Sequence, residues 1–223
     1  RTAAVLIEAV QGEGGIVPAD PAFMEGVRAL CDEHGILMLC DEVQCGMGRT
    51  GRWFGYQHYE AQPDAIALAK ALGGGFPMGA IAAAPSCADV FRPGHHASTF
   101  GGTPLACAAA LAVIRIIEEE GLLEHAARMG DRLLRGLGEL AERYDWIASV
   151  RGRGLMLGLV LNGPARPLQQ ALQARGALAL ATAERVLRLL PPLNISASEV
   201  DEALEKIAAA CEDVAKDAGG TAE

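Results

Sequence analysis

The feature that most constrains the fold is the alternation of short apolar runs with segments of helical length. Apolar runs predict strands over residues 3–9, 36–40, 65–69 and 79–84, and periodic segments predict helices over 20–34 and 103–120. Such alternation is typical of βαβ units, in which helices cover a mostly parallel sheet. Because 51% of the residues are hydrophobic but only 4% are aromatic, Ala, Leu, Val and Ile must form the core. The expected fold class is α/β.

The chain changes in character near residue 120. A more charged amphipathic helix is expected over residues 122–144, and the last helix is expected to be capped by Ser198. Short strands are predicted over residues 147–151, 155–161, 177–181 and 186–189. This pattern of short strands and helices predicts a second, smaller α+β domain over residues 121–223, after a first domain over residues 1–120.

Charge and cysteine usage exclude several classes of partner. The formal charge of −9 disfavours binding to nucleic acid or to an anionic membrane surface. The longest apolar stretch, residues 106–117, is interrupted by Arg115 and is shorter than the roughly 20 residues of a membrane span. No CxxC pair is present, so no metal site is expected. Scattered, reduced cysteines favour a cytoplasmic protein.

Polar side chains follow three of the predicted strands. Glu8 ends the first, Asp41 the second and Lys70 the third, and a glycine-rich turn follows the lysine. Singly, each has a simple explanation, because strand ends often carry turn or cap residues and a lysine can extend to water. The turn lacks the Lys-Ser/Thr ending of a phosphate-binding P-loop, which argues against a nucleotide-binding module. Together, opposite charges at one sheet edge indicate a ligand site.

Five segments occur in one order and carry a family resemblance. They are EAVQGEGG at residues 8–15, DEVQCGMGRTG at 41–51, KALGGGFPMG at 70–79, STFGG at 98–102 and RLLPPLN at 188–194. Together they resemble the class III (ω-amino acid) aminotransferases, and most of all the acetylornithine and ornithine aminotransferase branch. The resemblance covers nearly the whole chain.

The resemblance implies a fold-type I enzyme that depends on pyridoxal 5'-phosphate. Lys70 would carry the cofactor as a Schiff base, and Asp41 would face the pyridine nitrogen and keep it protonated, which makes the ring an electron sink. Val43 would pack on the ring face and Gln44 would lie near the ring hydroxyl. Residues 1–120 would then be the C-terminal part of the cofactor-binding large domain, and residues 121–223 the small C-terminal domain.

The resemblance also assigns residues to the substrate and to a partner subunit. Thr99 would reach the cofactor phosphate of a neighbouring subunit and Ser98 would lie near the substrate, which implies a homodimer. Glu13 and Arg188 would form a pair that is closed while a terminal amine reacts. The pair would open when a substrate α-carboxylate binds the guanidinium.

The expected activity is transfer of a terminal amine from N2-acetylornithine or ornithine to 2-oxoglutarate. The products would be a semialdehyde and glutamate, in arginine biosynthesis. Another ω-aminotransferase, acting on 4-aminobutyrate, succinylornithine or a lysine derivative, remains an alternative. So does a non-catalytic fragment, because the family's N-terminal segments for the cofactor phosphate and ring do not appear in this sequence. The chain is therefore expected to be the C-terminal half, or slightly more, of a subunit.

Overall fold

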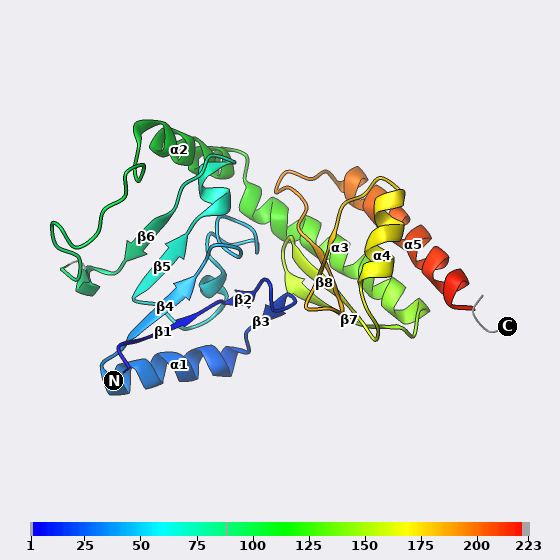
Figure 1. Ribbon diagram of the computed structural model, residues 1–223, viewed down its shortest axis with the longest axis horizontal. Coiled ribbons are helices and arrows are strands. Elements are labelled where there is room, and N and C mark those ends of the chain that lie inside the picture. The colour runs from blue at the N-terminus through cyan, green and yellow to red at the C-terminus, as the bar shows by residue number, and fades with distance from the viewer. Residues whose placement is uncertain (1, 88, 220–223) are drawn as a thin grey trace. The chain divides into compact units, whose positions relative to one another are not determined.

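The apolar runs of the first half form one four-stranded sheet in the computed structural model, which describes residues 2–87 and 89–219 (Figure 1). The strand order is β1 (Ala4–Ile7), β4 (Leu37–Asp41), β5 (Ala65–Leu68) and β6 (Ala80–Ala83). The pairs β1–β4 and β4–β5 are parallel, whereas β6 runs antiparallel to β5. The predicted α/β class with a mostly parallel sheet is confirmed.

The chain divides into two compact units. The first contains the residues up to Val10 together with Ala19–Leu123, and the second contains Gln11–Pro18 together with the residues from Glu124 onward. The sequence placed its boundary at residue 120 and counted the segment Gln11–Pro18 with the first part. The assignment of the two parts as cofactor-binding and small domains stays a prediction.

Helix α1 (Pro21–His34) begins and ends at the residues that the sequence indicated. Asp20 caps it, because its Oδ1 accepts hydrogen bonds from the backbone N–H of Ala22 at 2.8 Å and of Phe23 at 3.4 Å. Pro21 occupies the first turn, where a missing N–H costs nothing. Gly35 ends the helix in the left-handed conformation with φ of 60°.

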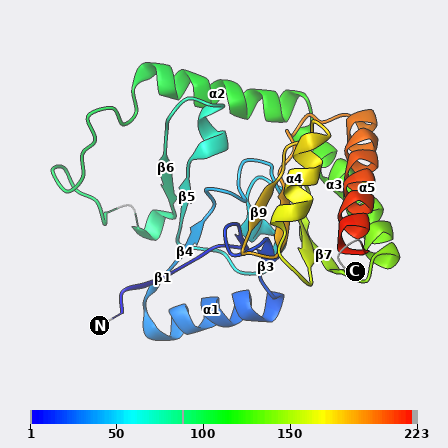
Figure 2. The same cartoon turned by 45° about the vertical axis from the view of Figure 1, so that its right-hand side comes forward.

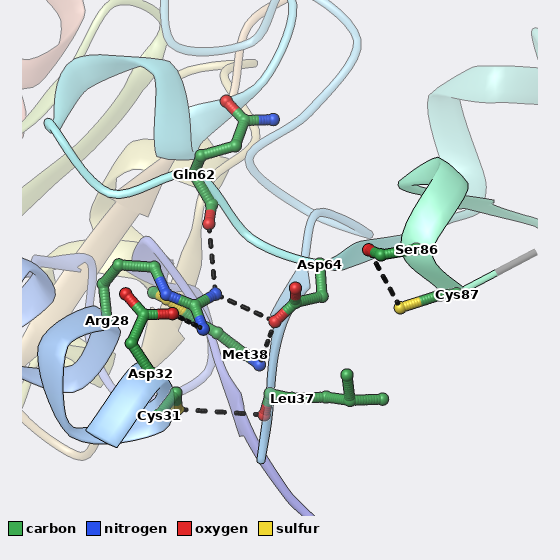
Figure 3. A network of polar contacts seen from close by, with 9 residues as sticks. All are labelled: Arg28, Cys31, Asp32, Leu37, Met38, Gln62, Asp64, Ser86 and Cys87. Atoms are coloured by element: carbon green, nitrogen blue, oxygen red, sulfur yellow. Dashed lines mark hydrogen bonds and ion pairs between the residues drawn. The ribbon is translucent and has the colours of Figure 1, made fainter. Parts of the chain in front are cut away.

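Arg28 ties α1 to the sheet that it covers (Figure 3). Its Nη1 donates to Asp64 Oδ2 at 2.8 Å and to the Gln62 carbonyl at 3.2 Å, and its Nη2 pairs with Asp32 Oδ1 at 2.8 Å. Asp64 Oδ2 also accepts the backbone N–H of Met38 in β4 at 2.8 Å. Burial alone would raise the pKa of Asp64, but the bonds from Arg28 and Met38 outweigh it and lower that pKa.

Short elements connect the strands of the first unit. The 3₁₀ helices are η1 (Gly55–His58), η2 (Lys70–Gly73) and η3 (Pro85–Cys87). Helix α2 (Pro104–Glu119) follows and packs on η2. It buries Ala106, Ala110 and Ile117 but leaves Leu105 and Leu111 exposed. No helix in the described part of the chain is long and apolar enough to span a membrane.

The second unit is built around an antiparallel sheet of order β7 (Ile147–Arg153), β8 (Met156–Leu161), β10 (Val186–Leu189) and β9 (Leu180–Thr182). The helices of this part are α3 (Leu122–Arg143), α4 (Arg166–Ala174) and α5 (Ala197–Gly219), and α4 and α5 lie side by side (Figure 2). Its core is rich in leucine, and Leu137, Leu159 and Leu187 are fully buried. A separate two-stranded sheet pairs β2 (Val10–Gln11), where the segment Gln11–Pro18 begins, with β3 (Val17–Pro18), where it ends.

Three details of the second unit differ from the sequence-based expectation, and the first is that the strand predicted over residues 177–181 is β9 (Leu180–Thr182), which begins three residues later. Helix α5 is capped by Ser196 and not by Ser198, because Ser196 Oγ accepts the Glu199 N–H at 3.2 Å while Glu199 Oε2 accepts the Ser196 N–H at 2.7 Å. Helix α4 was not predicted. It has nine residues and buries only Leu168 and Leu172, so its periodic signal is short.

Candidate active site

Asp41 and Lys70 leave the sheet at the same edge. Asp41 is the last residue of β4 and stands in parallel register with Ala67 of β5, and Lys70 follows β5 after one further residue. The backbone N–H of Glu42 donates to the Ala67 carbonyl at 3.0 Å, which extends the pairing beyond β4. The carboxyl ends of parallel strands are where open α/β sheets bind ligands. The structure therefore brings these two predicted residues to one candidate site.

Lys70 has a backbone conformation that a lysine adopts only at a cost. Its φ is 45°, in the left-handed region, and it opens η2 directly after an extended Ala69. For a residue with a Cβ this costs roughly 1–2 kcal/mol. Helix α2 packs closely against the turn that follows Lys70, because a Cβ added at Gly74 would lie only 2.8 Å from Val113 Cγ2 in that helix. The strain therefore falls on an exposed lysine at a strand end, which is typical of functional positions.

The Asp41 carboxylate is oriented by its own turn. Its Oδ1 accepts the backbone N–H of Val43 at 3.0 Å, so the chain turns sharply where β4 ends. Asp41, Val43 and Gln44 are all half-buried. The Asp41 carboxylate is fixed and partly buried, and the neighbouring strand is followed by the exposed Lys70. Such a carboxylate can stabilise a positively charged ring that binds at these strand ends.

Glu13 and Arg188 form an ion pair within the second unit. Arg188 lies in β10, in register with Gly158 of β8 and Leu180 of β9, and its Nη1 donates to Glu13 Oε1 at 2.6 Å. The arginine side chain is 9% exposed and the glutamate side chain is 74% exposed. A nearly buried guanidinium that meets an exposed carboxylate can exchange that carboxylate for one on a ligand.

Comparison with known proteins identifies the family to which these residues belong. The model of the class-III aminotransferases matches residues 1–211. The chain belongs to the class-III aminotransferases. Its fold is accordingly the α/β fold of the fold-type I pyridoxal-phosphate enzymes, as the sequence predicted.

Curated proteins similar to this chain include acetylornithine aminotransferases. The acetylornithine aminotransferase of Gloeobacter violaceus is 54% identical over 205 residues, which are 91% of this chain and 51% of that protein. Acetylornithine aminotransferase 1 of Bordetella bronchiseptica is 52% identical over 91% of this chain and 51% of that protein. The chain therefore spans about half the length of the curated class-III aminotransferases that it matches.

Solved structures of the same family have the same fold. The N-acetylornithine aminotransferase of Stenotrophomonas maltophilia superposes with a TM-score of 0.87 at 40% identity, over 96% of this chain and 57% of that one. The ornithine aminotransferase of Toxoplasma gondii superposes with a TM-score of 0.91 at 34% identity, over 96% of this chain and 52% of that one.

A buried acid beside Asp41 is a feature of this candidate site that sequence reasoning did not single out. Glu42 is 1% exposed, and it accepts the N–H groups of Gly55 at 2.7 Å and Tyr56 at 2.8 Å and the Cys45 thiol at 3.1 Å. Burial raises the pKa of Glu42 even though these bonds oppose the shift. Glu42 thus anchors the loop that follows Asp41. The only sequence signal was a second acid immediately after the strand end.

Ser98 and Thr99 lie in an irregular, exposed segment between η3 and α2. The structure shows neither side chain buried, and their expected roles toward substrate and a partner subunit's cofactor stay predictions. No group of three or more His, Cys, Asp or Glu residues that could hold a metal ion occurs among residues 2–87 and 89–219.

Proposed function

We propose that the enzyme carrying this chain transfers the terminal amine of N2-acetylornithine or ornithine to 2-oxoglutarate, with pyridoxal 5'-phosphate as cofactor. The products are a semialdehyde and glutamate, and the reaction serves arginine biosynthesis. The observation that carries the proposal is Lys70, an exposed lysine held in left-handed backbone beside the strand that ends in Asp41. The amine is chosen because relatives at 52–54% identity are acetylornithine aminotransferases.

The residues at the strand ends fit the cofactor. Lys70 offers an exposed amine, and Asp41 offers a carboxylate fixed by the Val43 N–H at 3.0 Å. Val43 and Gln44 would hold the ring face and its hydroxyl, and Thr99 of a partner subunit would hold the phosphate. When bound, pyridoxal phosphate supplies an electron sink for the carbon that bears the substrate amine.

Each residue has a defined chemical task. The negative charge of Asp41 stabilises a proton on the nitrogen atom that it faces, because opposite charges within a few ångströms favour the ionised form. Once the substrate amine has replaced it on the cofactor, Lys70 Nζ would be a free amine that can take the proton from the substrate carbon as general base and then hold that proton as general acid.

Arg188 and Glu13 select between the two substrates. With the pair closed at 2.6 Å, the charge of Arg188 is compensated, and a donor that presents a terminal amine meets no uncompensated cation. 2-Oxoglutarate carries a carboxylate that can replace Glu13 on the planar guanidinium, and the exposed Glu13 then turns to solvent.

The proposal includes a cytoplasmic homodimer. The exposure of Ser98 and Thr99 supports residues that act on a partner subunit. All six cysteines are free thiols, which agrees with a reducing compartment.

An amine panel tests the substrate. The holoenzyme would be assayed with 2-oxoglutarate and, in turn, acetylornithine, ornithine, succinylornithine, 4-aminobutyrate and lysine derivatives. The highest kcat/KM is expected for acetylornithine or ornithine, and a much higher value for another amine would refute the substrate assignment. Borohydride reduction followed by peptide mass analysis is expected to place the cofactor on Lys70, and cofactor found on another lysine would refute the site.

A further inference from the structure

Two side chains from the four-stranded sheet of the second unit donate hydrogen bonds to backbone carbonyls of the loop that carries Glu13. Thr182, the last residue of β9, donates its hydroxyl to the Glu13 carbonyl at 2.9 Å. Arg151 in β7 donates from Nε at 3.0 Å and from Nη2 at 2.8 Å to the Gly15 carbonyl. Thr182 is 8% exposed and Arg151 is half-buried, so water competes little for these bonds.

At Gly15 and Ile16 the backbone has positive φ values and is tightly packed. Ile16 is fully buried with φ of 57°, which is a rare conformation for a β-branched residue. Gly15 has φ of 101°, and a Cβ there would lie 3.0 Å from Ala183 Cβ and 3.1 Å from Arg151 Nη2. Such strain persists only where the surroundings hold the backbone in place.

The backbone of Glu13 is held in place, whereas its side chain is largely exposed. Its carbonyl is bound by a buried hydroxyl, whereas its carboxylate is attached to a side chain that is 74% exposed. The contact that it makes with Arg188, at 2.6 Å, depends steeply on position, because hydrogen bonds weaken when distance or angle departs from the optimum.

We infer that Thr182 and Arg151 are positioning residues that fix the Glu13 backbone, so that the Glu13–Arg188 pair opens by side-chain rotation alone. The inference rests on the proposed function of that pair. With the backbone fixed, Glu13 returns to Arg188 after each carboxylate leaves. With the backbone loosened, the pair closes less often and Arg188 is open to dicarboxylates while the amine donor should bind.

Binding of glutarate to the holoenzyme tests the inference without chemistry. Glutarate has the two carboxylates and the chain length of 2-oxoglutarate but lacks the reactive carbonyl. Thr182→Val keeps the side-chain shape and removes the donor, and it is expected to raise glutarate affinity about three- to tenfold in calorimetry. The KM for the amine donor should rise by a similar factor with little change in kcat. Thr182→Ser restores a hydroxyl and should bind glutarate as the unsubstituted enzyme does.

A double-mutant cycle separates positioning from a general structural role. Glu13→Gln is expected to raise glutarate affinity on the order of tenfold or more, because Arg188 loses its charged competitor. Thr182→Val should add nothing in the Glu13→Gln background. Equal effects of Thr182→Val in both backgrounds, or an effect of Glu13→Gln with none of Thr182→Val, would overturn the inference and leave the pair's proposed role intact.

The remaining outcomes are also decisive. If Glu13→Gln leaves glutarate affinity unchanged, the proposed role of the pair fails and the positioning inference fails with it. If Thr182→Val does not fold, Arg151→Lys replaces it in the same cycle, since lysine keeps the charge but lacks the planar fork that binds the Gly15 carbonyl. The same rise in affinity and the same lack of additivity with Glu13→Gln are expected, and their absence would overturn the inference.

Discussion

The two groups of site residues present their charges in opposite ways. At the ends of β4 and β5, Lys70 is exposed and Asp41 is half-buried. In the second unit, Arg188 is 9% exposed and already bound to Glu13 at 2.6 Å. A group that reacts must be accessible to its ligand, whereas a group that only recognises a carboxylate must stay compensated until that carboxylate arrives. The difference in exposure therefore follows the difference in proposed task.

Backbone strain is distributed differently as well. In the first unit the strained positions include the proposed reactive residue, since Lys70 has φ of 45°, and also Met47 with φ of 56°. In the second unit they are Ile16, three residues after Glu13, and the turn residues Ala183 and Glu184, while β10 holds Arg188 in regular register with its neighbours. The strained positions thus include a proposed reactive residue in the first unit and only loop residues in the second.

Replacing Lys70 gives the largest effect and tests the reactive half of this comparison. Lys70→Ala removes the group that moves the proton, so amine transfer should fall by about a thousandfold or more in a steady-state assay. The midpoint of thermal unfolding should change little, because the side chain is exposed. Lys70→Gly is the matched control, since it also relieves the positive φ. Substantial residual transfer in both variants would show that Lys70 is not the base.

Replacing Arg188 tests the recognition half. Arg188→Lys keeps the charge but loses the planar fork, and kcat/KM for 2-oxoglutarate should fall by roughly ten- to a hundredfold. The half-reaction with the amine donor, followed by stopped-flow absorbance, should fall much less. Equal losses in the two half-reactions would mean that Arg188 does not discriminate between the substrates.

Replacing Asp64 tests how much the opposite end of the strands, where β5 begins, contributes to the stability of the first unit. Asp64→Asn weakens the bonds to Arg28 and to the Met38 N–H, and it should lower the free energy of unfolding in urea by about 1–3 kcal/mol. The folded-state pKa of Asp64 is lowered, so its contribution is present above the unfolded value near 3.8 and is lost as pH falls through the folded value. The difference between the two proteins should therefore shrink in acid below about pH 4. A difference that does not change with pH would contradict this account.

Ser196 gives the smallest expected effect and concerns a helix of the second unit. Ser196→Ala removes the side-chain cap of α5 and should cost about 1 kcal/mol in urea unfolding. Ser198→Ala is the control, and it should cost less because the structure places Ser198 inside the helix. The opposite ranking would support Ser198 as the cap, as the sequence predicted.

Much of the first unit was predictable because its signals are local. The strands of this mostly parallel sheet appear as continuous apolar runs, even though β6 is antiparallel and exposed, and Asp20 and Gly35 marked the two ends of α1. The cap of α5 was assigned two residues too late, although Glu199 lies three residues after Ser196 and marks a capping box. Helix α4 has too few turns for its apolar spacing to stand out.

The site was predictable only where chemistry and position coincide. Asp41 and Lys70 attracted notice as charges that follow apolar runs, but the positive φ of Lys70 depends on tertiary structure. Glu13 and Arg188 are 175 residues apart, and only the family resemblance paired them. The bonds from Thr182 and Arg151 end on backbone carbonyls, which every residue has, so no sequence pattern reveals them.

The assignment of Gln11–Pro18 to the second unit has a consequence for folding and for cutting the molecule. The chain passes from the first unit to the second, returns within eight residues, and crosses again after Leu123. The two units are therefore joined by three covalent crossings, and a single cut between Leu123 and Glu124 does not yield two intact pieces. The N-terminal piece would keep the Glu13 loop, and the C-terminal piece would retain Thr182 and Arg151 without the carbonyls that they bind. The second unit thus needs a segment from within the first unit's stretch of chain, whereas the first unit needs no residue after Leu123.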